Sequence, residues 1–131
     1  MTDEADRTSG PGLRLTMSRA RIVLNDEGEF QEVAIRCPAC KWSDGSPMDH
    51  YLNVKCPPEL KESAHNAGRP HWGWNGSLDK PTFSPSLLNY IESPNGRRCH
   101  SFIRDGRIEF LSDCTHALKG QTVDLPEIPD D

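Results

Sequence analysis

The turn Asp105-Gly106 constrains the fold of this chain more than any other feature of its sequence. It separates two segments with alternating apolar residues, Cys99 to Arg104 and Arg107 to Leu111. Asp-Gly between two such segments is a strong signal for a β-hairpin with a two-residue turn. The sequence therefore predicts an antiparallel pair of strands with a defined register.

That register determines which face of the hairpin each side chain occupies. Ile103 is expected to pair with Ile108, and Leu111 comes to lie opposite His100. Adjacent residues of a strand point to opposite faces, so Cys99 shares the apolar face with Ile103 while His100 lies on the other face. Cys99 and His100 therefore cannot both bind one ion unless the strand is distorted.

The rest of the chain predicts short strands and long loops. Only 34% of the residues are hydrophobic, and eleven prolines and ten glycines interrupt the chain, which favours a small core. Further strands are expected at 21–24, 30–36, 51–56 and 121–125, and short helical turns at 59–66 and 114–119. The predicted fold class is mostly β (small α+β at most): zinc-ribbon-like β-hairpins joined by long Pro/Gly-rich loops, with one short helical turn near the C-terminus.

The segment 81–86 contains two prolines and is therefore expected to be extended. Each proline lacks the N–H that a sheet ladder needs, so this segment is not expected to form a central strand. Two interpretations stay open. The segment crosses the edge of the sheet, or its hydroxyl groups on Thr82, Ser84 and Ser86 line a site.

The length and the cysteine content narrow the class of protein. A chain of 131 residues fits one domain, expected at 19–125, between a flexible N-terminal tail at 1–18 and an acidic C-terminal tail at 126–131. No apolar run approaches the ~20 residues that span a bilayer, and no signal peptide is recognisable, which predicts a cytoplasmic protein. Structural disulfides are rare there, so the five cysteines indicate metal binding or reactive thiols.

A CxxC motif, Cys37-Pro38-Ala39-Cys40, is the best candidate for half of a metal site. It is expected to leave a strand and enter a loop, and no long helix follows, which favours a zinc knuckle over a redox dithiol. A structural Zn²⁺ takes four cysteine or histidine ligands. The remaining ligands are expected among Cys99, His100, Cys114 and His116, with His50 and Cys56 as weaker candidates.

Two blocks of the sequence, WNGSLDKPTFSPSLL and CHSFIRDGRIEFLSDCTHALKGQTVDLP, resemble a known family when taken with the upstream CPAC and His50. They are similar to the DUF6527-type family of uncharacterised proteins common in bacteriophages and prophages. The resemblance implies a compact β-rich zinc domain and places the segment 81–86 beside the metal. It implies that Asp113 neighbours the site, and it points to these metal-site candidates: Cys37, Cys40, Cys99, His100 and His116. It implies no activity, and it suggests the host cell cytoplasm if the protein is phage-encoded.

Three functions follow from these patterns. The first is a zinc-stabilised phage- or prophage-type accessory protein that binds a host or phage protein and is not an enzyme, with a closed four-ligand site. The second is a zinc-dependent hydrolase with an open metal site and Asp113 as the candidate base, with Asp105 and Glu109 as alternatives. The third is a single-stranded nucleic-acid-binding zinc-knuckle protein, which the net charge of −5 disfavours. No membrane partner is expected, and the oligomeric state stays open.

Overall fold

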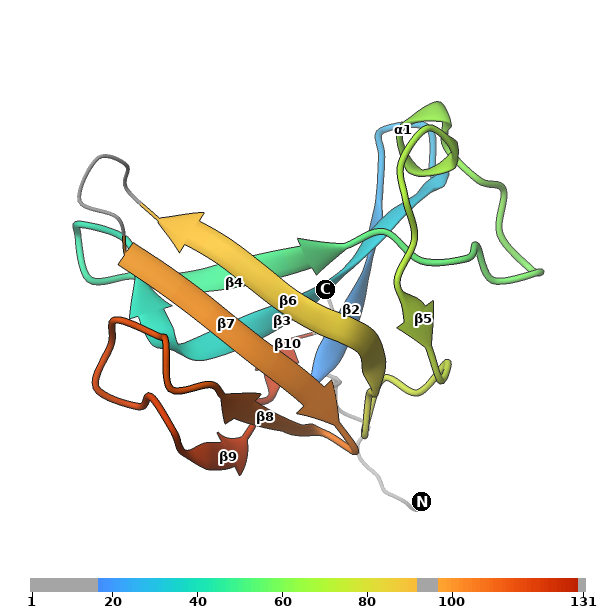
Figure 1. Ribbon diagram of the computed structural model, residues 1–131. Coiled ribbons are helices and arrows are strands. Elements are labelled where there is room, and N and C mark those ends of the chain that lie inside the picture. Colours follow the sequence, from blue (N-terminus) through green and yellow to red (C-terminus); the bar gives the residue numbers. More distant parts are fainter. Residues whose placement is uncertain (1–16, 92–96, 130–131) are drawn as a thin grey trace, which may run out of the picture.

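The computed structural model describes residues 17–91 and 97–129. Within these residues the chain forms two main antiparallel sheets, of three strands and of five strands (Figure 1). The three-stranded sheet has the order β2 (Ala20–Leu24), β3 (Phe30–Lys41), β4 (Pro47–Leu52). The five-stranded sheet has the order β5 (Gly73–Trp74), β6 (Phe83–Ile91), β7 (Arg97–Arg104), β8 (Arg107–Phe110), β9 (Thr122–Asp124).

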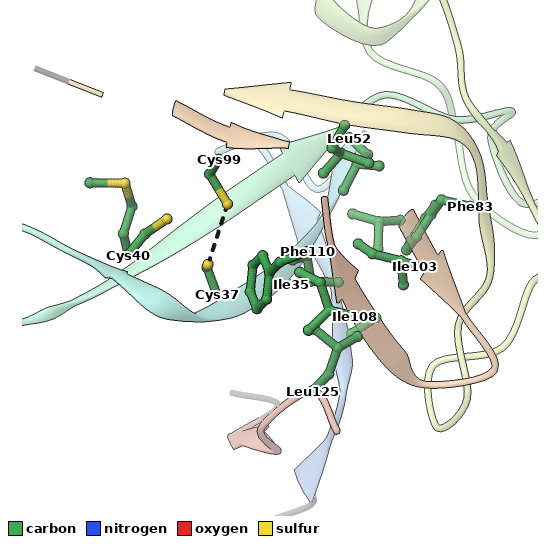
Figure 2. Packing of buried hydrophobic residues seen from close by; sticks show 14 of the residues in the cluster. Ile35, Cys37, Cys40, Leu52, Phe83, Cys99, Ile103, Ile108, Phe110 and Leu125 are labelled. Carbon is green, nitrogen blue, oxygen red and sulfur yellow. Dashed lines mark hydrogen bonds between the residues drawn. The ribbon is translucent and has the colours of Figure 1, made fainter. Parts of the chain in front are cut away.

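The two sheets enclose one hydrophobic core. Strand side chains alternate between core and surface, as a half-buried sheet requires. On β7 the inner face carries the buried residues Cys99, Ser101 and Ile103. Figure 2 shows side chains from both sheets packed together in this core, among them Ile35, Leu52, Phe83, Ile103, Ile108 and Phe110.

The predicted hairpin is confirmed. Ile103 pairs with Ile108 across β7 and β8, and the turn lies at Asp105 and Gly106. Both turn residues have a positive φ, 54° and 78°, as a two-residue turn with the twist of a hairpin requires. The carbonyl of Pro81 accepts a hydrogen bond from the Gly106 amide at 3.0 Å, which ties the hairpin to the start of β6.

The mostly β fold class is confirmed, but of the two expected helical turns only the one at 59–66 forms within the described residues, and only at its end. The helix found in the described residues is α1 (Ala64–Ala67), where the Ser63 hydroxyl accepts a hydrogen bond from the Asn66 amide as an N-cap. The segment 114–119 forms turns instead of the expected helix. Its backbone is drawn toward β7, because the Thr115 amide donates to the carbonyl of Arg98 at 3.0 Å.

Two strands of the smaller sheet differ from their predicted bounds. β3 continues through the CxxC motif to Lys41, where a loop was expected. β4 begins at Pro47, earlier than the predicted strand at 51–56. As a result His50 lies within β4, opposite Ile35 of β3, with its side chain in the core.

The prediction that the proline segment avoids the interior of a sheet is wrong, because Phe83 to Ser86 begin β6 between β5 and β7. Two features remove the objection to a proline at this position. β5 pairs only with Phe83 and Ser84, and the β6–β7 register shifts between Phe83 and Leu87. Pro85 therefore lies in the irregular part of the ladder, where its missing N–H costs little.

The parts of the expected tails that the structure describes are paired. β1 (Met17–Ser18) and β10 (Ile128–Pro129) form a two-stranded sheet, and Ile128 is buried. Residues 1–16, 130 and 131 of the expected tails lie outside the described residues. Within the part of the chain that the structure describes, no helix is long and apolar enough to cross a membrane.

Candidate functional site

Four buried side chains from three strands form a cluster that can hold a metal ion such as zinc. The cluster consists of Cys37 and Cys40 on β3, His50 on β4 and Cys99 on β7. One ligand atom from each residue lies within 4.8 Å of the ligand atoms of the other three. Figure 2 shows the three cysteines, with Cys37 of one sheet facing Cys99 of the other.

An irregularity in β3 brings the two sulfurs of the CxxC motif to one side. In a regular strand Cys37 and Cys40, three positions apart, would point to opposite faces. The β3–β4 register shifts between Cys37 and Lys41, and both cysteines are buried. His50, a weaker candidate from the sequence, lies within a strand because β4 begins before the expected segment 51–56.

The spacing of the cluster matches a zinc site with tetrahedral geometry. The Sγ atoms of Cys37 and Cys99 lie 3.8 Å apart. Two sulfurs bound to one tetrahedral Zn²⁺, at about 2.3 Å each, are separated by about 3.8 Å. His50 is only 3% exposed, and its buried Nε2 has no hydrogen-bond partner among the described residues. A bound metal would satisfy this nitrogen.

The thiols of the cluster perturb one another. Hydrogen bonds from Cys40 and then Cys99 hold the pKa of Cys37 far below its usual range. The Cys37 thiolate raises the pKa of Cys40 to about 12, and Cys37 followed by Cys40 raises the pKa of Cys99. Buried thiolates this close need a shared proton or a shared cation, and a divalent metal supplies the cation.

On the opposite face of β7, His100 takes part in a different arrangement. Its Nε2 lies 3.1 Å from Oγ of Ser86 on β6, and its Nδ1 lies 3.1 Å from Oδ2 of Asp113 in the loop after β8. An ionised carboxylate only accepts hydrogen bonds, so the neutral tautomer that fits both contacts has its proton on Nδ1, and its Nε2 can accept the proton of the Ser86 hydroxyl. Serine, histidine and aspartate in this order can act as a nucleophile, a general base and a group that orients the base.

Side-chain hydrogen bonds hold the loop that carries Asp113 against β7. The Cys114 thiol accepts from the His100 amide at 3.2 Å and donates to the His100 carbonyl at 3.1 Å. Thr115 makes the next contact, since its hydroxyl accepts from the Arg98 amide at 2.9 Å. These bonds continue the edge of β7 beyond the end of β8, and they place Asp113 beside the imidazole of His100.

The structure divides the residues expected at the metal between two sites. Cys37, Cys40 and Cys99 meet one another with His50 as the fourth member of the cluster. His100 contacts Ser86 and Asp113 instead.

His116 belongs to neither site by direct contact. Its ring packs edge-on against Phe110 with 4.5 Å between the ring centroids, and the Leu118 amide donates to its Nδ1 at 3.2 Å. Burial lowers the pKa of His116. It therefore packs as a neutral ring beside the core.

Ser86 is the member of this hydrogen-bonded arrangement that sequence reasoning ranked lowest. It was expected only as one of three hydroxyls that could line a site, because the prolines argued against a paired strand. The available signal for Ser86 was the alternation of side chains along the strand, which turns His100 away from Cys99. A histidine turned away from the metal needs another partner.

The family model for BubE, described as "Bacterial ubiquitination-like system serine protease", matches residues 10–111. The match spans more than half of the 131 residues and contains Ser86 and His100, while Asp113 lies beyond its end. No curated protein and no solved structure matches the chain. The family match shows that two expectations are wrong: the phage-type family without an assigned activity, and the non-enzymatic accessory module.

Proposed function

The chain belongs to the BubE family of bacterial ubiquitination-like system serine proteases, and we propose that it is a protease whose nucleophile is Ser86. The hydrogen-bonded chain from Ser86 through His100 to Asp113 carries this proposal. The family description supports the reaction class, and the 3.1 Å contacts support the assignment of roles. The hydrolase expected as an alternative is kept in a modified form, with a serine hydroxyl as the nucleophile in place of a metal-bound water.

In the proposed reaction Ser86 Oγ attacks the carbonyl carbon of the scissile bond, and its proton passes to Nε2 of His100. His100 then gives this proton to the leaving amine, and the acyl group stays on Ser86. A water molecule attacks the acyl-enzyme with His100 again as the base, which releases the acid product and restores Ser86. Asp113 orients the imidazole throughout and stabilises its positive charge.

The substrate is proposed to be a protein of a bacterial ubiquitination-like system, in agreement with the family description. The protein partner expected from the sequence is then this substrate. Nucleic acid stays the disfavoured alternative.

We also propose that Cys37, Cys40, His50 and Cys99 bind one zinc ion with a structural role. Three cysteines and one histidine at this spacing are a closed zinc ligand set, with no position left for water. The site lies in the core between the two sheets, and its ligands come from both of them. Reduced thiols support a cytoplasmic location, because cytoplasmic proteins keep their cysteines available for metals.

Labelling with a small fluorescent alkyl fluorophosphonate tests the nucleophile. Ser86 Oγ displaces fluoride from phosphorus, and the released proton passes to His100, so the wild-type protein should carry one adduct. Ser86→Ala should carry none. Ser84→Ala is the matched control, because Ser84 lies two residues away in an exposed position, and it should be labelled like the wild type. Labelling of Ser86→Ala at the wild-type rate would overturn the proposal.

A further inference from the structure

The strand that carries Ser86 has an open edge next to the nucleophile. β7 lies along one side of β6, while β5 pairs on the other side only with Phe83 and Ser84. In Figure 1, β5 lies beside only the first part of β6. Within residues 17–91 and 97–129, no strand pairs with this edge beyond Ser84. Unpaired edges offer N–H and C=O groups to which another chain can add as a strand.

The hydrogen bonds of β7 show which of its backbone groups face β6. The amide of His100 donates to Cys114, and the carbonyls of His100 and Arg98 accept from Leu111 and Thr115. His100 and Arg98 therefore face the β8 side of the strand. Backbone groups alternate in direction along a strand, so the N–H and C=O groups of Cys99 and Ser101 face β6.

The same alternation continues on β6. Cys99 and Ser101 of β7 are paired with Asn89 and Leu87, whose backbone groups must face β7. Leu88, between these two, therefore points its N–H and C=O toward the open edge, and Tyr90 does the same.

The Ser86 carbonyl points in this direction too. It accepts a hydrogen bond at 3.4 Å from the indole Nε1 of Trp72, which directly precedes β5. Trp72 therefore lies on the open-edge side of β6.

Ser86, the proposed nucleophile, precedes the unpaired backbone groups of Leu88 and Tyr90 along β6. Ser86, Leu88 and Tyr90 share one face of β6, so the Ser86 hydroxyl lies between His100 and the open edge. Proteins commonly protect an edge with lysine, proline or a covering loop. Beyond Ser86, β6 has no proline or lysine, and it carries two exposed apolar side chains, Leu88 at 46% and Tyr90 at 66% exposure.

A groove runs beside the far end of this edge. Its volume is about 310 Å³, and Asn89 and Tyr90 of β6 line it together with Met48, Asp49 and His50 of β4. Trp42 and Tyr51, two half-exposed aromatic side chains near the ends of β3 and β4, line the groove as well. Aromatic walls of this kind accept an apolar side chain from an extended peptide.

We infer that the substrate polypeptide adds as an antiparallel strand to the open edge of β6, where it bonds to the backbone of Leu88 and Tyr90. This inference rests on the proposed protease function. Antiparallel pairing continues the arrangement of the whole five-stranded sheet. It also makes the added chain run toward Ser86, so that the residues preceding the scissile bond occupy the edge and an apolar one enters the groove. The protease then selects an extended segment and not a folded surface.

Peptidyl diphenyl phosphonates test the inference, because their phosphorus reacts with the catalytic serine and their peptide part extends to the preceding residues. One probe carries a single residue before the phosphorus, and the other is a mixture with four randomised residues. Two main-chain hydrogen bonds are worth about tenfold or more in rate, so wild type should react at least that much faster with the longer probe. The measured quantity is the ratio of the two labelling rates.

Proline at position 88 removes the edge donor, and an edge strand accepts it because that N–H faces away from the ladder. Leu88→Pro should therefore lower the ratio toward one. Leu88→Ala keeps the N–H and removes the side chain, so its ratio should lie above that of Leu88→Pro. A ratio near one in wild type, or an undiminished ratio in Leu88→Pro, would overturn the inference and leave the protease function intact. Failure of every probe to label Ser86 would overturn the protease function and this inference with it.

Discussion

Cys99 and His100 are neighbours in the chain, and they lie on opposite faces of the same strand. Cys99 points into the core, where it meets Cys37 of the other sheet. His100 points to the outer face, where it contacts Ser86 and Asp113. One strand thus separates a buried thiolate cluster from a solvent-accessible hydrogen-bonded triad. The two faces suit different tasks, because holding the fold needs a closed site and catalysis needs an open one.

Loss of the metal should have the largest effect, and it acts on the inner face. Cys99→Ser is expected to abolish the cooperative fold, since a structural zinc contributes about 10–16 kcal/mol while a domain is stable by only about 5–15 kcal/mol. Thermal unfolding and metal analysis by mass spectrometry measure this. Cys56→Ser is the control, because Cys56 lies outside the cluster and should keep both metal and melting temperature. An unchanged melting transition in Cys99→Ser would show that the cluster does not hold the fold.

Replacement of His100, the proposed general base, should affect only the outer face of β7. His100→Ala is expected to lower kcat for hydrolysis of an acyl ester on the order of 10⁶-fold, as the loss of a triad histidine does elsewhere. The zinc content and the melting temperature should stay close to the wild-type values. His65→Ala, at another half-buried histidine, should leave the activity unchanged. If His100→Ala lost the metal instead, His100 would be a ligand and the division between the faces would be wrong.

Asp113→Asn should have a smaller effect, because serine and histidine stay in place. Asparagine can stabilise the wrong tautomer of His100, and a drop in kcat of about 10⁴-fold is expected. The fold should be unaffected, since Asp113 is half-exposed. Asp124→Asn is the matched control, because Asp124 pairs with the exposed Arg107, away from His100. Equal activities of the two variants would remove Asp113 from the triad.

The smallest effect is expected at the residue that links the Asp113 loop to the strand. Cys114→Ala removes two hydrogen bonds to the His100 backbone and should lower the free energy of unfolding by about 1–3 kcal/mol. Misplacement of His100 should lower kcat about tenfold or more while KM changes little. Cys114→Ser keeps a donor and an acceptor and should recover most of kcat. Equal losses of kcat in the two variants would show that Cys114 only fills space.

Part of this arrangement could be predicted from the sequence. The Asp105-Gly106 turn defines the hairpin register, and the alternation of side chains along that strand is enough to separate Cys99 from His100. These features follow from local periodicity and from one turn, which are the strongest signals that a single sequence carries. Asp113, which the resemblance implied to be a neighbour of the metal site, lies instead beside His100 at 3.1 Å.

The remainder depended on irregular backbone. His50 joins the cluster because β4 begins at Pro47, and Ser86 reaches His100 because a register shift accommodates Pro85 in a paired strand. Both positions result from pairing between distant strands, which overrides local preference. A proline in a strand pattern argued against pairing, and Pro85 marks the irregularity beside which Ser86, the proposed nucleophile, lies.

Native mass spectrometry of the labelled wild-type protein tests the separation of the two faces most directly. After reaction with the small fluorophosphonate, one molecule should carry one zinc ion and one adduct together, with the adduct mapped to Ser86 by proteolytic digestion. A protein that loses its zinc when labelled, or that carries the label on a cysteine of the cluster, would contradict the account.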